Sequence, residues 1–253
     1  MVMITFTLLR MVILPSLRFD LVLLGIFVTI NVDTQFIMIM LAALLTAAGA
    51  DWLIQSHPSY LRGTPTIRHW IIPAITSLAA GSILAGVPAG PALWIGLPLA
   101  SILLMAVLIA EYIVQNPDDP RRSAAVVILT GLAYVLLLGV MYAIQAANLR
   151  AVYAVPLSFL ASLAIGWRLL KLSHPGVSVF PYSTAIAMIA AEAIWALHYW
   201  PMPPLRTGLL FCVVVYLGKS LTEAIIEHRL DRSRWRELGI FTSLTLGLVL
   251  LLT

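Results

Sequence analysis

The stretch PALWIGLPLASILLMAVLIAEYIV, residues 91–114, decides the fold class of this chain. It carries a single ionisable side chain apart from its one tyrosine, Glu111, near its end. A helix of roughly 24 residues is about 36 Å long, which exceeds the bilayer's hydrocarbon core of about 30 Å. The turn-forming run NPDDP and the pair Arg121 and Arg122 follow closely. This order predicts a transmembrane helix that ends at a basic cytoplasmic connection.

The composition of the whole chain repeats the character of this stretch. Of its 253 residues, 61% are hydrophobic and 10% are charged, and the mean hydropathy is +1.01. Soluble domains carry about 25% charged residues, so too few charges remain here to cover a water-facing surface. The alternating pattern of a membrane β-barrel is absent, and helices are the other structure that satisfies backbone polar groups within a bilayer. We therefore predict an all-α, polytopic transmembrane helical bundle.

Nine apolar blocks have the length of a membrane span. We predict spans at about Leu8–Asn31, Gln35–Gln55, His69–Gly86, Pro91–Val114, Ser123–Gln145, Ala151–Leu170, Val179–Tyr199, Leu205–Glu227 and Leu238–Leu252. Pro15 leaves open whether residues 1–18 span the bilayer or lie in its interface. The connections are short and rich in Pro, Gly, Asn and Asp, so we expect a single integral membrane domain over residues 1–253.

The basic residues predict the orientation. With the N-terminus in the cytoplasm, only Arg150 and Arg206 fall outside, and the nine-span topology leaves the C-terminus outside. The twelve on the cytoplasmic side are Arg10, Arg18, Arg62, Arg68, Arg121, Arg122, Arg168, Lys171, Arg229, Arg232, Arg234 and Arg236. This is a strong positive-inside bias. The net charge of +4 is therefore an orientation signal, and we expect the lipid bilayer, not nucleic acid, as the partner.

Most of the tryptophan and tyrosine residues lie near the ends of the predicted spans, at the level of the lipid head groups. Four aromatic residues lie within the spans instead, and we expect them to face other helices. They are Tyr134, Tyr142, Trp195 and Tyr216.

Ionisable residues within spans are costly and need an explanation. Lys219, Glu223 and Glu227 recur every four residues in the eighth predicted span, and Tyr216 lies nearby on the same side. Two interpretations stay open for them, a structural ion pair or a functional group such as a proton relay. Glu192 in the seventh span is either a buried, hydrogen-bonded structural carboxyl or part of a relay.

A second polar group is expected at the cytoplasmic ends of the spans. Its catalytic candidates are Asp51, Glu111 and Glu223, because carboxylates with histidines are ligands of hydrolytic metal sites. The candidate metal ligands are His57, His69 and His228, although their spacing matches no known metal motif. His198 is a candidate haem or pigment ligand. Cys212 is the single cysteine, so no intramolecular disulfide forms, and we predict no cofactor.

Three phrases resemble those of an uncharacterised bacterial family of multi-pass membrane proteins. They are Ala110-Glu111-Tyr112, His198-Tyr199-Trp200-Pro201 and Pro204-Leu205-Arg206-Thr207-Gly208-Leu209-Leu210. The resemblance covers most of the chain and implies a membrane protein of unknown function, with no catalytic residues to carry over. We accordingly expect a multi-pass protein of the cytoplasmic (inner) membrane of a bacterium.

Three functions stay open, and the first is our best prediction. It is a non-enzymatic subunit or scaffold of a membrane complex, with other membrane subunits as partners. The second is a proton-coupled or small-solute transporter that uses Glu192 with Lys219 and Glu223. The third is an intramembrane lipid-modifying enzyme with the acid and histidine group at its cytoplasmic face.

Overall fold

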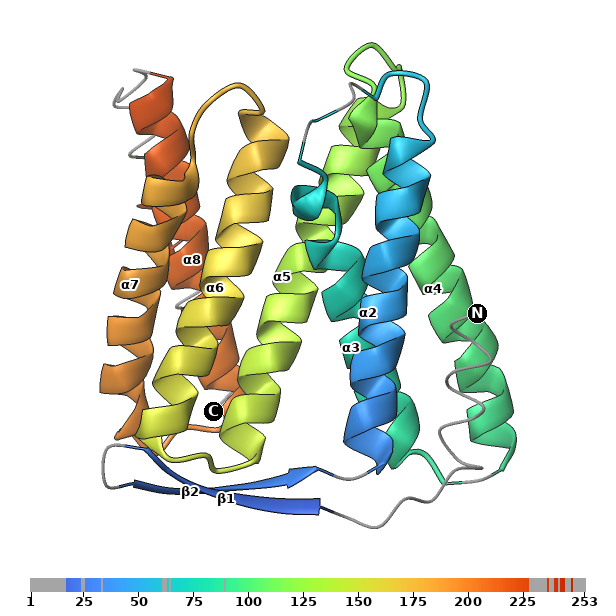
Figure 1. Ribbon diagram of the computed structural model, residues 1–253. Coiled ribbons are helices and arrows are strands. Elements are labelled where there is room, and N and C mark those ends of the chain that lie inside the picture. Colours follow the sequence, from blue (N-terminus) through green and yellow to red (C-terminus); the bar gives the residue numbers. More distant parts are fainter. Residues whose placement is uncertain are drawn as a thin grey trace. The chain divides into compact units, whose positions relative to one another are not determined.

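The computed structural model describes residues 17–23, 26–32, 34–60, 63, 65–88 and 90–227, and a few isolated positions between 236 and 247. Within this part, seven helices are long and apolar enough to cross a membrane (Figure 1). The chain is therefore an integral, multi-pass membrane protein.

The seven helices match seven of the predicted spans, with ends that differ by about three residues at most. They are α2 (Thr34–Gln55), α3 (Ile71–Gly86), α4 (Pro91–Gln115), α5 (Arg122–Ala146), α6 (Ala151–Ser173), α7 (Phe180–His198) and α8 (Pro204–Ile226). A short 3-10 helix, η1 (Ile67–His69), leads into α3. The predicted ninth span, Leu238–Leu252, lies almost wholly outside the described residues, as does His228.

The predicted first span, Leu8–Asn31, is wrong where the structure describes it. Two antiparallel strands, β1 (Leu17–Leu23) and β2 (Ile26–Val32), pair from Leu17 opposite Val32 to Leu23 opposite Ile26. The sequence of β2, IFVTINV, consists mainly of β-branched and aromatic residues, which favour extended backbone. The predicted all-α bundle therefore holds for the membrane-length elements, and residues 17–32 depart from it.

The described chain divides at Ala125 into two compact units, residues 1–125 (unit 1) and 126–253 (unit 2). In unit 1, α2, α3 and α4 pack through small and aliphatic side chains. Ala42, Leu84 and Leu97 form a buried cluster there. A Cβ added at Gly96 would lie 2.9 Å from Leu84 Cδ2, so the absence of a side chain permits the close approach of α3 and α4.

Unit 2 contains nearly all of α5 and the whole of α6, α7 and α8. Small buried residues recur every fourth position along α6, at Ala154, Ser158, Ser162 and Gly166. Apolar burial does not drive helix association inside lipid, where close packing of small residues takes its place. Ser158 and Ser162 donate their hydroxyls to the carbonyls four residues earlier, at 2.6 and 2.7 Å, so burial leaves neither hydroxyl unsatisfied.

Helices α7 and α8 also approach closely. A Cβ at Gly218 would lie 3.1 Å from both Cγ atoms of Ile186. Similarly, a Cβ at Gly208 would lie 2.8 Å from Leu138 Cδ1 on α5. Glycines at these two positions of α8 allow it to pack against both neighbours.

Candidate functional site

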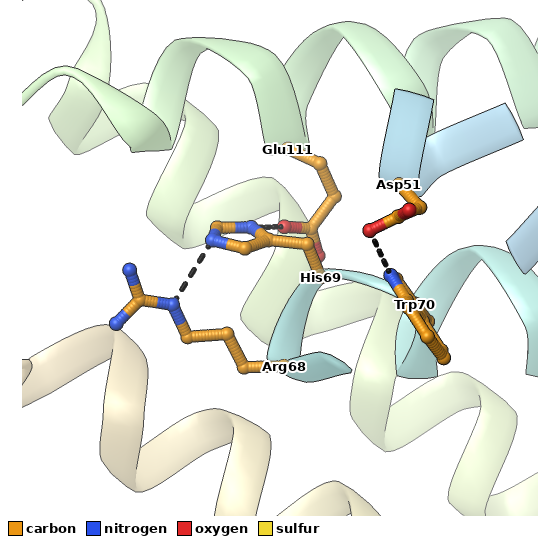
Figure 2. A network of polar contacts seen from close by, with 5 residues as sticks. All are labelled: Asp51, Arg68, His69, Trp70 and Glu111. Carbon is orange, nitrogen blue, oxygen red and sulfur yellow. Dashed lines mark hydrogen bonds and ion pairs between the residues drawn. The ribbon is translucent and has the colours of Figure 1, made fainter. Parts of the chain in front are cut away.

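The most enclosed polar contact of unit 1 joins His69 to Glu111. His69 Nδ1 lies 2.8 Å from Glu111 Oε2, and the two side chains are 2% and 1% exposed. Arg68 Nε donates to His69 Nε2 at 3.1 Å (Figure 2). An arginine N–H can only donate, so Nε2 accepts and the imidazole proton resides on Nδ1, facing the carboxylate. The contacts form a chain of guanidinium, neutral imidazole and carboxylate.

Local structure places these three residues at one end of unit 1. Arg68 and His69 lie in η1, at the end of the connection between α2 and α3, and Glu111 lies one turn before the end of α4. The short 3-10 turn orients His69 toward α4 while its backbone N–H donates to the carbonyl of Thr66 at 2.8 Å. The buried contact therefore ties this connection to α4.

Asp51 anchors the same connection to α2. Its Oδ1 accepts a hydrogen bond from the Thr66 hydroxyl. The same oxygen accepts a second hydrogen bond from Trp70 Nε1 at 3.2 Å, which Figure 2 shows. Its Oδ2 accepts from Gln55 Nε2 at 2.7 Å. Three donors on one carboxylate satisfy most of its hydrogen-bonding capacity. Since Trp70 follows His69 directly, the two clusters position the start of α3 together.

The candidate metal ligands do not form a metal site in the described part of the chain. His57 Nδ1 accepts from the backbone N–H of Ser59 at 3.0 Å, and its ring packs against Tyr112 with centroids 4.3 Å apart. No group of three or more His, Cys, Asp or Glu side chains that could hold an ion occurs among the described residues. Of the three catalytic candidates, Asp51 and Glu111 lie in unit 1, whereas Glu223 belongs to unit 2.

In unit 2, Lys219 pairs with Glu223 on its own helix. Lys219 Nζ lies 2.8 Å from Glu223 Oε1, and the side chains are 13% and 19% exposed. This is the simpler of the two interpretations that the sequence left open. The pair neutralises two charges that would otherwise be costly within a span.

A tyrosine pair lies near this ion pair. The rings of Tyr216 on α8 and Tyr134 on α5 are 6.1 Å apart, and the Cys212 thiol points to the carbonyl of Tyr134 at 3.7 Å. The Tyr134 hydroxyl is buried with no hydrogen-bond partner among the described residues. Both tyrosines face another helix, as expected, but the sequence gives no signal that the Tyr134 hydroxyl is left without a partner.

Glu192 is exposed on the surface of α7, so the prediction of a buried carboxyl is wrong. It lines a shallow groove of about 360 Å³ together with Trp195, Ala196 and Tyr199. A second groove, of about 420 Å³, is lined in part by the same two aromatic residues, Trp195 and Tyr199. Trp195 is 59% exposed, so the other described helices of unit 2 leave it largely uncovered, contrary to the expectation that it faces another helix. A charged residue in an apolar run does not by itself show whether its face of the helix points into the protein or away from it.

The second groove lies between the first turns of α6 and the last turns of α7. It is lined by Ala151, Val152, Val155, Pro156, Trp195 and Tyr199. His198 lies beside it in sequence, with its ring in an edge-on contact with that of Tyr199 at 5.6 Å and its Nδ1 buried. This arrangement gives the His198 ring an aromatic neighbour and shields one of its two nitrogens.

Two further polar residues of unit 2 have positions that the sequence did not indicate. Arg168 is 1% exposed although it carries a charge, whereas the sequence indicated only an orientation signal. Arg168 is close to Lys171 along the chain, and we therefore grouped it with the connection between α6 and α7. His174 Nε2 lies 3.4 Å from Glu227 Oε1, which joins the connection between α6 and α7 to the end of α8.

Comparison with known proteins gives a family and no function. No curated protein matches the chain, and no solved structure matches it either. A family model described as "Protein of unknown function (DUF5656)" matches residues 14–252. The match covers nearly the whole chain, including all seven membrane-length helices, and the chain therefore belongs to this family of unknown function.

Proposed function

We propose that this protein is a non-enzymatic component of a membrane protein complex and that helix α7 forms its contact with a partner. The observation that carries the proposal is the exposure of Glu192 in the middle third of a span. Its neighbours on the same face are mainly apolar and aromatic, including Met188, Ile189 and Trp195, each more than half exposed.

The energetic argument concerns the carboxylate in hydrocarbon. An ionisable side chain near the centre of a span costs roughly 2.5–3.5 kcal/mol on insertion scales. Glu192 forms no hydrogen bond or ion pair with the described residues, and the residues that share its groove are apolar or aromatic. A partner helix that covers this face removes the cost, so the charge favours association.

The other polar groups within the described spans are arranged differently. His69 and Glu111 bind each other and Arg68, and Lys219 binds Glu223. These contacts balance charge inside the protein itself. Glu192, by contrast, is directed outward, and this contrast supports an intermolecular role for it.

The test is purification of the full chain in a mild detergent from its native membrane. We expect an assembly larger than the monomer, and Glu192→Leu should reduce the co-purified partner at least tenfold because the polar contact is lost. Ile128→Leu is the matched control, since Ile128 is exposed on α5 and the change conserves volume and charge; it should leave the assembly intact. A lone monomer in every detergent and in native-lipid nanodiscs would contradict the proposal.

A proton-coupled or small-solute carrier is the second candidate function. The Tyr134 hydroxyl favours this function. It is buried without a partner among the described residues, and its ring lies close to that of Tyr216. An unsatisfied polar group of this kind can bind a proton or a polar solute. Glu192 and the pair of Lys219 and Glu223 would be its charged groups. Proton uptake by reconstituted vesicles that Tyr134→Phe abolishes, with the assembly unchanged, would favour this function over the scaffold.

An intramembrane lipid-modifying enzyme is less well supported by the geometry. Its imidazole, His69, uses Nδ1 to contact Glu111 and Nε2 to accept from Arg68. Both ring nitrogens are therefore engaged, and a base or metal ligand needs one of them free.

We also propose that the chain lies in the cytoplasmic membrane of a bacterium, with the α2–α3, α4–α5 and α6–α7 connections on the cytoplasmic side. Six basic residues of these connections then lie on that side and two, Arg150 and Arg206, lie on the other, which keeps the positive-inside bias. The six are Arg62, Arg68, Arg121, Arg122, Arg168 and Lys171. The residues just before α2 are then outside, because α2 crosses the membrane to reach its cytoplasmic connection.

Cysteine labelling in intact cells tests this orientation. In a Cys212→Ala background, which has no other thiol, Ala147→Cys in the α5–α6 connection should react with a membrane-impermeant maleimide. Ser173→Cys, at the opposite end of α6, should react only after the cells are permeabilised. The reverse pattern would invert the proposed orientation.

A further inference from the structure

We infer that the partner seated on α7 is a transmembrane helix that carries a lysine or arginine at the level of Glu192. The inference rests on the proposed function, because it names the chemistry of that partner. It is carried by two shallow grooves that share Trp195 and Tyr199, because the first offers the carboxylate of Glu192 and both offer aromatic faces.

The carboxylate of Glu192 is the charged acceptor on this surface. It lines the first groove and forms no hydrogen bond or ion pair with the described residues. A lysine or arginine on a partner helix supplies the N–H donors and the opposite charge that this carboxylate lacks.

The aromatic walls add to the preference for a cation. Trp195 and Tyr199 are 59% and 73% exposed, and both residues line both grooves. A lysine or arginine head group over an aromatic ring gains about 0.5–2 kcal/mol, more where water is excluded. The surface therefore attracts a positive charge through the carboxylate and through the rings.

Depth distinguishes a helix from a lipid head group. Glu192 precedes the last residue of α7, His198, by roughly six residues, which is about 9 Å along the helix axis. The ammonium of a lipid lies at the head-group level, where aromatic residues such as Tyr199 and Trp200 gather. A partner helix can place a basic side chain at the depth of Glu192 without moving a lipid into the hydrocarbon.

The exposed face of α7 has the pattern of a helix-packing seam. Ala185, Ile189, Glu192, Ala196 and Tyr199 are all exposed and are spaced alternately by four and three residues. This spacing is that of the contact positions in left-handed helix pairs, and a polar residue within such a seam selects a particular partner and register. The seam extends over most of α7, as a helical partner requires.

A second copy of this chain does not provide the complementary charge from the described spans. Their cations more than one turn from a helix end are Arg168 and Lys219. Arg168 is 1% exposed, and Lys219 is 13% exposed and paired with Glu223. A different protein therefore fits the site better than a homodimer.

Synthetic helices test the inference without knowledge of the natural partner. The full-length protein is reconstituted in vesicles of phosphatidylcholine and phosphatidylglycerol, which contain no primary amines. Its binding of a dansyl-labelled Leu/Ala transmembrane peptide, with one lysine roughly six residues from its outer end to match the depth of Glu192, is measured by energy transfer from tryptophan. We expect this peptide to bind at least tenfold more tightly than the same peptide with leucine there. Glu192→Gln should abolish that difference, and Ile128→Leu, at an exposed position on α5, should leave it intact.

The outcomes separate the inference from the proposed function. Equal binding of the two peptides overturns the inference, and the proposed function still stands if α7 forms cross-links to a natural partner. Displacement of the lysine peptide by added phosphatidylethanolamine identifies a lipid ammonium as the occupant and also overturns it. Binding in which arginine and lysine peptides both exceed leucine, with loss in Glu192→Gln, supports it.

Discussion

Replacement of Glu111 by leucine removes the acceptor of the most enclosed polar contact in unit 1. The His69 Nδ1–H then has no carboxylate, at a site where both side chains are at most 2% exposed. A buried donor left without a partner costs about 1–3 kcal/mol, and the upper part of this range applies where the lost bond had a charged partner. Because the lost acceptor is the Glu111 carboxylate, we expect a loss of about 3 kcal/mol in the free energy of unfolding. Glu111→Gln keeps an acceptor and should lose about 1 kcal/mol, the difference between a charged and a neutral bond.

The assay is SDS-induced unfolding of the purified protein in mixed micelles, followed by far-UV circular dichroism. The double variant His69→Leu and Glu111→Leu removes donor and acceptor together and should be at least about 1 kcal/mol more stable than the sum of the single losses predicts. Additive losses, or a Glu111→Leu variant within about 0.5 kcal/mol of the wild type, would refute the buried contact.

Two further predictions concern packing and charge in unit 2, both measured by the same SDS titration. Gly218→Val should lower stability by about 1–3 kcal/mol through overpacking, because its Cβ would meet Ile186 at 3.1 Å. Gly139→Val, where nothing lies within 4 Å, should change stability by less than about 1 kcal/mol, and equal effects of the two changes would argue against the α7–α8 contact. Lys219→Met should be destabilising because it leaves Glu223 largely buried and unpaired. Adding Glu223→Leu to this variant should restore most of the lost stability. A double variant that is less stable than the single one would contradict a purely structural pair.

The membrane helices could be predicted from the sequence because the bilayer imposes their length and apolar character. The hairpin of residues 17–32 could not be predicted in this way. Hydropathy measures transfer from water and does not distinguish helix from strand, whereas β-branched content, as in Ile26–Val32, does. This error changes the span count but leaves the relative orientation of α2–α8 along the chain intact.

The candidate site was predictable to a lesser extent. Asp51, His69 and Glu111 lie at helix ends, so a charge in an otherwise apolar run was enough to single them out. The role of Arg68 as a donor to His69 depends on the 3-10 turn of η1, which single-sequence patterns do not specify. The outward direction of Glu192 depends on the rotation of α7, which is set by small residues of the helix contact rather than by Glu192 itself.

Photo-cross-linking along α7 in native membranes tests the central claim most directly. A benzophenone side chain placed at Ala185, Ile189 or Ala196, all exposed, should form an adduct of one defined mass with another protein. The same probe at Ala187 or Ala190, both buried, should form no such adduct. Adduct formation at Ile189 should fall when Glu192 is replaced by leucine. Exposed positions that label lipid alone, or buried positions that cross-link equally well, would contradict the account.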